Sequence, residues 1–300
     1  MKIAAVIVTF NRLNLLKKVI ESIRRQTVQP NAVIVVDNGS TDGTEEWLAR
    51  EPGLTVIRQK NVGGAGGFHT GIKYAYEHAF DWIWCMDDDV WPRPDCLQHL
   101  LENDHDSVGI LCPKRIQNGK TIFTEIVKFN LANPFADIKK IRLKELFVGK
   151  KAIEIEGMSF EGPLIKNEVV ARIGYPEKEL FLFYDDTDYS YRAVSEGYKV
   201  LYVSDGVLDK AYFDDGFSQV EKVVRNKWRL KYHLRNTTYF CKKHGKNLFF
   251  RYFGSMPLYL HMLGAICYNL PRNKKYTFKD INMLFEMYLN GIKERLGKNR

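Results

Sequence analysis

The sequence lacks the cysteine patterns of zinc-binding and disulfide-rich domains. Its five cysteines, at positions 85, 96, 112, 241 and 267, form no Cys-x-x-Cys pair. This spacing argues against a structural zinc site, and an odd count suits reduced cytosolic thiols better than a disulfide framework. A signal-peptide pattern is also missing, because the apolar run Ile3–Thr9 starts at once. We therefore expect the first residues to belong to the fold.

Acidic residues are scarce near the end of the chain. From Gln219 to Arg300 there are 18 Lys and Arg against 4 Asp and Glu, a net charge of +14; the whole chain carries +9, which leaves −5 for residues 1–218. This asymmetry predicts a domain over 1–218 and a basic extension over 219–300. The extension is either a solvated basic surface or a binding surface for anionic lipid, nucleic acid or a polyanionic carrier, and the acidic front part argues against nucleic acid.

Charged residues are absent from one longer stretch. Tyr252–Leu270 contains no Asp, Glu, Lys or Arg and approaches the length of a membrane span. It is interrupted by residues that weaken a spanning helix, namely Gly254, Pro257, His261, Gly264 and Asn269. We favour an interfacial helix beside basic residues, or an ordinary packed helix, over a membrane span.

Strand and helix signals alternate through the front part of the chain. This alternation predicts an α/β fold with a parallel sheet and helices on both faces. We expect a hairpin or loop excursion over residues 115–155. Strand and helix signals return over 162–173, and the pattern after about residue 218 is mostly helical. The expected strands are Ile3–Thr9, Ala32–Asp37, Leu54–Arg58 and Trp82–Met86, and the expected helices are Leu13–Gln26, Thr44–Arg50 and Gly66–Ala79.

Polar clusters follow three of these strands. They are Thr9-Phe-Asn-Arg12, Asp37-Asn-Gly-Ser40 and Asp87-Asp88-Asp89. Ligands of parallel sheets bind outside the carboxyl ends of the strands, so we expect the clusters to share one crevice.

The run Asp87–Asp89 brings three adjacent carboxylates to the end of an apolar strand. Like charges so close repel each other unless a cation lies between them, and Mg²⁺ or Mn²⁺ would fit. Alternation along an extended segment places Asp87 and Asp89 on one side and Asp88 on the other. A solvated acidic turn is the structural alternative.

Two further segments suit a nucleotide. Asp37 can accept hydrogen bonds from a base or ribose, although Asp and Ser also cap such strand–turn–helix connections. The run Asn61-Val-Gly-Gly-Ala-Gly-Gly-Phe68, which includes Gly63 and Gly64, lets the backbone approach a phosphate, or is a plain tight turn. No Gly-Lys-Ser/Thr follows, so it is not a P-loop.

A second acidic centre lies in Phe181-Leu-Phe-Tyr-Asp-Asp-Thr-Asp188. A carboxylate in an aromatic setting gains proton affinity, as a general base requires. A helix N-cap cluster is the structural alternative.

Together these segments resemble family 2 glycosyltransferases of the GT-A fold over roughly residues 3–240. Val6–Arg12 is similar to the opening strand of the family, Val35–Ser40 to its uracil-contacting strand, and Asp87–Asp89 to its DxD motif. The glycine-rich run looks most like galactofuranosyltransferases. Phe183–Tyr189 is similar to their W-D-D-x-E-Y segment, with Tyr184 in place of Trp and Asp188 in place of Glu.

The resemblance implies a role for each matched residue. Asp186 would be the catalytic base and Asp185 would bind the acceptor, together with Phe160, Glu161 and Gly162 of a matching S-F-x-G run. The family usually has a metal-ligating His where this chain has Asp209, which would join Asp87 and Asp89. The donor would contact Asp88 and the strand-end and glycine-rich residues Thr9, Asn11, Arg12, Asp37, Asn61, Gly63 and Gly64.

The implied reaction is metal-dependent, inverting transfer of galactofuranose from UDP-galactofuranose to a hydroxyl of a bacterial cell-surface glycan or lipid-linked acceptor. The enzyme would use Mn²⁺ or Mg²⁺ and work in the cytoplasm, at the inner face of the membrane, through its basic C-terminal region. A rhamnosyltransferase using dTDP-rhamnose is the first alternative. A nucleotidyltransferase and a non-catalytic nucleotide-sugar binding protein are alternatives of other classes; the former expects a basic glycine-rich loop after the first strand, where this chain has Asn11-Arg12-Leu13.

Overall fold

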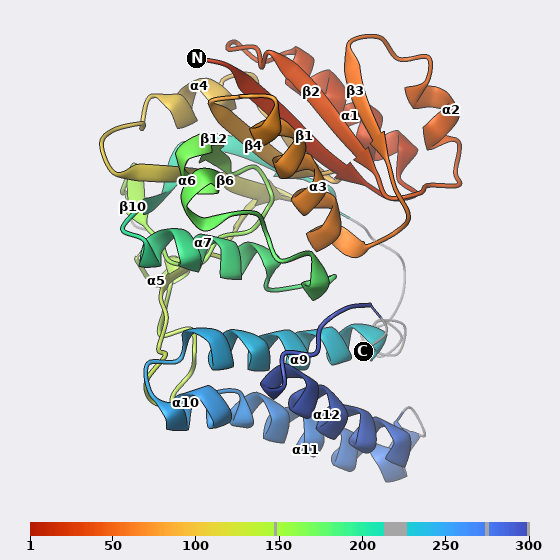
Figure 1. Ribbon diagram of the computed structural model, residues 1–300, viewed down its shortest axis with the longest axis vertical. Coiled ribbons are helices and arrows are strands. Elements are labelled where there is room, and N and C mark those ends of the chain that lie inside the picture. Colours follow the sequence, from red (N-terminus) through yellow and green to blue (C-terminus); the bar gives the residue numbers. More distant parts are fainter. Residues whose placement is uncertain (147–148, 213–226, 274–275, 299–300) are drawn as a thin grey trace. The chain divides into compact units, whose positions relative to one another are not determined.

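The computed structural model describes residues 1–146, 149–212, 227–273 and 276–298. The chain divides into two compact units (Figure 1). The first unit comprises Met1–Lys128, Ile141–Lys178 and Asp185–Tyr212, and the second comprises Phe129–Lys140, Glu179–Tyr184 and Phe213–Arg300. The predicted domain boundary between residues 218 and 219 lies outside the described residues.

Within the described residues, ten strands of the first unit form one mixed sheet. Its order is β10-β12-β6-β11-β4-β1-β2-β3, with β5 paired to β12 and β7 paired to β6. Strands β1 to β4 are parallel, as are β6 and β12, whereas β11 lies antiparallel between β4 and β6. The strands are β1 (Ile3–Thr9), β2 (Ala32–Asp37), β3 (Leu54–Arg58), β4 (Trp82–Asp87), β5 (Val90–Pro92), β6 (Val108–Gln117), β7 (Lys120–Ile122), β10 (Ala152–Glu154), β11 (Leu164–Lys166) and β12 (Lys199–Lys210).

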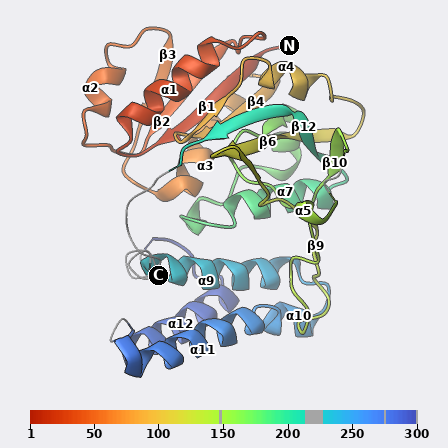
Figure 2. The ribbon, with the colours of Figure 1, turned by 180° about the vertical axis from the view of Figure 1, so that it is seen from behind.

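Helices cover both faces of this sheet (Figures 1 and 2). Along β1, alternate side chains enter opposite cores, since Ala4, Val6 and Val8 belong to one cluster and Ile3, Ala5 and Ile7 to the other. The first cluster includes side chains of α3 (Gly63–Glu77), α6 (Asn167–Ile173) and α7 (Asp185–Ser195). The second includes α1 (Leu13–Arg24), α2 (Thr44–Leu48) and α4 (Cys96–Leu101). The prediction of a GT-A-like α/β sheet with a helical C-terminal region is confirmed.

Two glycines bring α3 unusually close to β1. A Cβ on Gly67 would lie 2.4 Å from a methyl group of Val8, and one on Gly71 would lie 2.3 Å from a methyl group of Val6. Both distances are too short for non-bonded carbon atoms, so part of the glycine-rich run serves helix–strand packing. The first residues of α3 are thereby fixed beside the ends of β1 and β2.

The segment for which a hairpin or loop was predicted contains more structure than that. Strand β6 continues to Gln117 and turns back into β7, which is a hairpin. The strands β8 (Ile126–Lys128) and β9 (Ile141–Arg142) form a separate antiparallel pair, followed by the short helix α5 (Leu143–Leu146).

Helices dominate the second unit. They are α9 (Lys227–His244), α10 (Leu248–Phe253), α11 (Met256–Asn273) and α12 (Phe278–Ile292), and the 3₁₀ helix η1 (Lys178–Leu180) begins at its border. Its core contains Leu234 of α9, Met262 and Ile266 of α11, and Leu284 and Met287 of α12. In the part of the chain that the structure describes, no helix has the length and apolar character needed to cross a membrane.

Candidate active site

The polar ends of β1 and β4 meet at the carboxyl edge of the sheet. Asp88 accepts hydrogen bonds from the Thr9 hydroxyl (2.8 Å) and the Phe10 amide (3.3 Å). Arg12 donates to Asp88 (3.0 Å) and to Asp89 (3.1 Å). Asp88 therefore supports the loop after β1.

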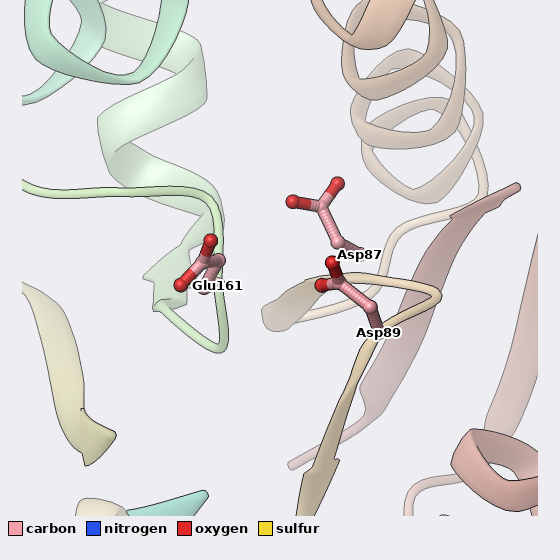
Figure 3. A group of neighbouring side chains, drawn as sticks. All are labelled: Asp87, Asp89 and Glu161. Atoms are coloured by element: carbon pink, nitrogen blue, oxygen red, sulfur yellow. The ribbon is translucent and has the colours of Figure 1, made fainter. Parts of the chain in front are cut away.

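Three carboxylates form an acidic group beside this loop (Figure 3). Oxygen atoms of Asp87, Asp89 and Glu161 all lie within 4.8 Å of one another. Asp87 ends β4, Asp89 lies in the turn after it, and Glu161 comes from the loop before β11. All three belong to the first unit.

The reversed direction of β11 explains how Glu161 reaches the group. An antiparallel strand presents its beginning, not its end, at the carboxyl edge of its parallel neighbours. The loop is pinned there because the indole of Trp84 donates to the carbonyl of Gly162 (2.9 Å) and the Gly162 amide donates to Cys85 (2.8 Å). Gly162 has φ +94°, and a Cβ there would lie 2.4 Å from Leu208, so glycine is required.

One partly buried and one buried cation bind the acidic group. Lys210, at the end of β12, forms ion pairs with Glu161 and with Asp89, the latter at 3.4 Å. Arg115, near the end of β6, is 2% exposed and forms ion pairs with Glu161 and Glu125. The sequence interpretation missed both residues, although each lies near the carboxyl end of a strand parallel to β4.

The charges in this group do not balance. Four carboxylates, Asp87 to Asp89 and Glu161, face three cations, of which Arg115 is shared with Glu125. Burial and the charges of Asp89 and Glu161 raise the pKa of Asp87 well above its ordinary value. Burial alone would raise the pKa of Glu161 too, but Arg115 and Lys210 hold it below its ordinary value. An oxygen-only donor set with excess negative charge suits Mg²⁺ or Mn²⁺.

The structure places Asp209 differently from the predicted metal ligand. Its carboxylate accepts two hydrogen bonds, both 3.0 Å, from the guanidinium of Arg93. It is not part of the acidic group of Asp87, Asp89 and Glu161, which is the candidate ligand group among the described residues. Neighbouring residues of a strand point to opposite faces, so with Lys210 turned toward the group Asp209 points away.

The second acidic centre opens helix α7. Burial, and then the charge of Asp186, raise the pKa of Asp185 to about 8. Burial raises the pKa of Asp186 to about 6, against hydrogen bonds from the Thr187 amide (2.6 Å) and hydroxyl (3.1 Å). The charges of Glu161 and Arg115 also act on Asp186, which ties the two acidic centres together electrostatically. Asp188 instead accepts from Arg192 (2.9 Å) within the helix.

The residues expected to contact the donor lie along the ends of β1 and β2. Asp37 is buried; one of its oxygens accepts from the Ser40 amide (2.9 Å), while Oδ2 has no hydrogen-bond partner among the described residues. Asn11 accepts from the Thr41 amide (2.7 Å). These contacts join the two strand ends into one polar surface.

The glycine-rich run adjoins this surface. Gly63 has φ +80°, and its amide is capped by Asn61 at 3.0 Å. Its carbonyl accepts from Asn38 (3.0 Å), the residue after Asp37. A Cβ on Gly64 would meet nothing within 4 Å, so packing within the chain does not require glycine there.

Phe160 contributes to the core. Its ring stacks on Phe68 of α3 with centroids 4.5 Å apart and contacts Tyr189 of α7 at 5.9 Å. It is 3% exposed, so its ring positions the Glu161 loop and offers little surface to an acceptor.

Comparison with known proteins places this fold and site in a family. The profile of glycosyl transferase family 2 matches residues 4–151. Galactofuranosyltransferase GlfT1 of Mycolicibacterium smegmatis is 27% identical over 207 residues, which cover 65% of this chain and 66% of that protein. The dTDP-rhamnosyl transferase RfbF of Shigella flexneri is 26% identical over 249 residues and 80% of each chain. The chain thus spans just under two thirds of the length of the galactofuranosyltransferase.

Solved structures support the same fold. GalNAc-T7, crystallised with UDP, GalNAc and Mn²⁺, matches 81% of this chain and 51% of its own with a TM-score of 0.57 at 16% identity. A mannosyltransferase of Pyrobaculum calidifontis in complex with GDP-mannose and Mn²⁺ matches 98% and 88% with a TM-score of 0.54. Residues 4–151, just under half of the chain, thus match glycosyl transferase family 2, and the fold resembles that of the GT-A glycosyltransferases. The predicted resemblance to family 2 glycosyltransferases is confirmed.

Proposed function

We propose that this chain transfers a sugar from a nucleotide-sugar to an acceptor hydroxyl, with inversion at the anomeric carbon. The observation that carries the proposal is the pairing of two unlike acidic centres in one unit. One centre, Asp87, Asp89 and Glu161, carries excess negative charge. The other holds a buried carboxylate, Asp186, whose pKa of about 6 lets it accept a proton near neutral pH.

The two acidic centres have different roles in the proposed reaction. Asp87, Asp89 and Glu161 would hold a divalent cation, Mn²⁺ or Mg²⁺, which when bound neutralises the charge of the departing nucleoside diphosphate. Asp186 takes the proton from the acceptor hydroxyl, whose oxygen then forms the new bond to the anomeric carbon. Asp185 binds the acceptor, and its raised pKa makes it a hydrogen-bond donor at neutral pH. The reaction requires no covalent enzyme intermediate.

The proposed donor is UDP-galactofuranose. It would contact the surface formed by Thr9, Asn11, Arg12, Asp37 and the glycine-rich run Asn61–Gly64. The similarity to the galactofuranosyltransferases supports this donor. The dTDP-rhamnosyl transferase and the O-antigen chain rhamnosyltransferase RfbN of Salmonella typhimurium, 22% identical, support dTDP-rhamnose as the second candidate.

Mass spectrometry of the products tests the donor. Purified protein is incubated with each nucleotide-sugar, synthetic saccharide acceptors, and either Mn²⁺ or a chelator. We expect an added hexose of 162 Da from UDP-galactofuranose only with the cation, whereas an added 146 Da from dTDP-rhamnose would replace our donor with the alternative. Retained UDP binding without product from any donor would favour a non-catalytic nucleotide-sugar binding protein.

The acceptor is proposed to be a lipid-linked or cell-surface glycan reached from the inner face of the cytoplasmic membrane. Helices α10 and α11 support this location because apolar side chains lie exposed on them within the basic region of the chain. An apolar helix face flanked by Lys and Arg suits the surface of an anionic bilayer. The exposed residues are Leu248, Phe249, Tyr252, Phe253, Leu260 and Tyr268.

Vesicle co-sedimentation tests this contact. The protein should pellet with phosphatidylglycerol vesicles and not with phosphatidylcholine vesicles, and the pair Phe249→Ser and Phe253→Ser should release it. Exposed Phe10 of the first unit offers a matched Phe10→Ser control. Equal binding of wild type and the double variant would refute a role for this face.

A further inference from the structure

The segment just before the second acidic centre has a strained backbone. Phe181, Phe183 and Tyr184 have φ values of +66°, +69° and +68°, in the left-handed region that side chains disfavour. The Leu182 amide also donates to the carbonyl of Leu180 at 2.7 Å, a hydrogen bond that together with the positive φ of Phe181 indicates the rare, strained kind of γ-turn. Such conformations persist only where the surroundings hold them.

One amide of helix α9 holds this backbone. Asn236 is fully buried, and its Nδ2 lies 3.0 Å from the carbonyl oxygen of Leu180, 2.8 Å from that of Leu182 and 3.0 Å from that of Phe183. Its own carbonyl accepts from Arg235 (2.9 Å), whose guanidinium donates to the Leu180 carbonyl at 3.1 Å. The strained carbonyls are therefore bound by neighbouring side chains of a single helix.

Aromatic contacts from the same helix hold the side chains of the segment. Phe181 stacks on Tyr232 with centroids 5.0 Å apart, and Tyr184 contacts Phe240 at 5.3 Å. Phe183 lies edge-on to His233 at 5.7 Å. Residues 179–184 and α9 belong to the same compact unit, so these contacts are internal to it.

The strained segment leads directly into the proposed catalytic pair. Tyr184 is bonded to Asp185, the first residue of α7, and Asp186 follows. The strained backbone therefore ends at the residue that directly precedes α7 in the chain. We infer that Asn236, supported by Arg235, is a positioning residue for the carboxylates of Asp185 and Asp186. This inference rests on the proposed function.

A graded set of variants tests the inference. Asn236→Ala removes the side-chain amide that donates to the three carbonyls, so that of these carbonyls only Leu180 keeps donors described here, Arg235 and Leu182. Asn236→Ser leaves a shorter donor at position 236. Thr238→Val is the matched control, because Thr238 is buried on the same helix and bonds to Leu234 and Ser255 (both 2.8 Å) instead of the strained segment. The full-length proteins are compared by kcat, donor KM and melting temperature.

We expect kcat to fall by about 100-fold for Asn236→Ala, the effect of a roughly 1 Å displacement of a catalytic group, and by less for Asn236→Ser. Donor KM should be unchanged because Asn236 contacts none of the residues proposed to bind the donor. Thr238→Val should keep its kcat despite a similar loss of melting temperature. Should Asn236→Ala not fold, Asn236→Ser and Arg235→Lys carry the test, with the same separation of kcat from KM.

Two outcomes contradict the inference. If Asn236→Ala and Thr238→Val, at equal loss of melting temperature, lose equal kcat, then Asn236 serves stability alone. A rise of donor KM without a fall of kcat would also refute positioning of the base. Failure of the proposed function is recognised separately, because the wild type would then form no product from any donor, or Asp186→Asn would remain as active as the wild type in the same assay.

Discussion

The two acidic centres of the active site differ in what surrounds them. The group of Asp87, Asp89 and Glu161 has Lys210, Arg115 and Arg12 bound to its members or neighbours. Asp185 and Asp186 lie at the start of a helix, and burial raises the pKa of both. Carboxylates of the two centres therefore have different proton affinities: Arg115 and Lys210 hold the pKa of Glu161 below its ordinary value, although that of Asp87 is raised, whereas the pKa values of Asp185 and Asp186 are both raised.

The largest effect on activity is expected from substitution of Asp186, in the second acidic centre. Asp186→Asn keeps the size and polarity of the side chain and removes its basicity. We expect transfer to fall by about 10²–10⁴-fold, the usual contribution of a general base, with UDP binding unchanged in calorimetry. Full activity of this variant would assign the base elsewhere.

Metal dependence distinguishes the acidic group from its neighbour Asp209. Glu161→Gln should raise the Mn²⁺ concentration for half-maximal activity by at least about tenfold, because it removes a carboxylate from the metal site. Asp209→Asn should leave that concentration unchanged, since Asp209 pairs with Arg93 outside the group. If Asp209→Asn raised the required Mn²⁺ concentration and Glu161→Gln did not, Asp209 and not Glu161 would be the metal ligand.

The next prediction concerns the pH dependence of kcat, which should follow the second acidic centre. The pKa of Asp186 is raised to about 6, so the base is ionised above that pH and protonated below it. We expect kcat to fall about tenfold for each unit of pH below 6, and to level off above it. Measurement from pH 4.5 to 8 with saturating Mn²⁺ checks this, and a flat profile down to pH 4.5 would contradict a general base in this environment.

The smallest expected effect is on stability. Asp185 has a folded pKa of about 8, above that of an unfolded chain, so its contribution to stability is present at low pH and lost as the pH rises through 8. Asp185→Asn should therefore melt about 2–4 °C higher than wild type at pH 8.5, the shift expected for about 1 kcal/mol, and equally at pH 4. A variant that melts lower at pH 8.5 would show that the carboxylate stabilises the fold.

Sequence patterns predict the front of the sheet well because its signals are local. Strands β1, β2 and β3 begin and end at the predicted residues, since each is an apolar run bounded by polar or turn residues. Helix α3 begins at Gly63, three residues before its predicted start. The Gly63 carbonyl accepts a hydrogen bond from Asn38, which follows β2, and this long-range contact has no local sequence signal.

The missed site residues depend on pairing between distant segments. Arg115 and Lys210 meet Glu161 only because β6, β11 and β12 are neighbours in the sheet, and the antiparallel direction of β11 has no local signal. The same pairing decides which face of β12 carries Lys210 and which carries Asp209. A local pattern of residue types does not specify the order in which distant strands pair.

The second unit is formed by three separate stretches of the chain, and this affects the order in which its parts are synthesised. Residues 129–140 and 179–184 belong to this unit, yet most of their partners lie after residue 226. A ribosome adds about 5–20 residues per second, so these segments wait on the order of ten seconds for α12 to appear. Until α9 is synthesised, the chain before Asp185 lacks the side chains that hold its left-handed backbone.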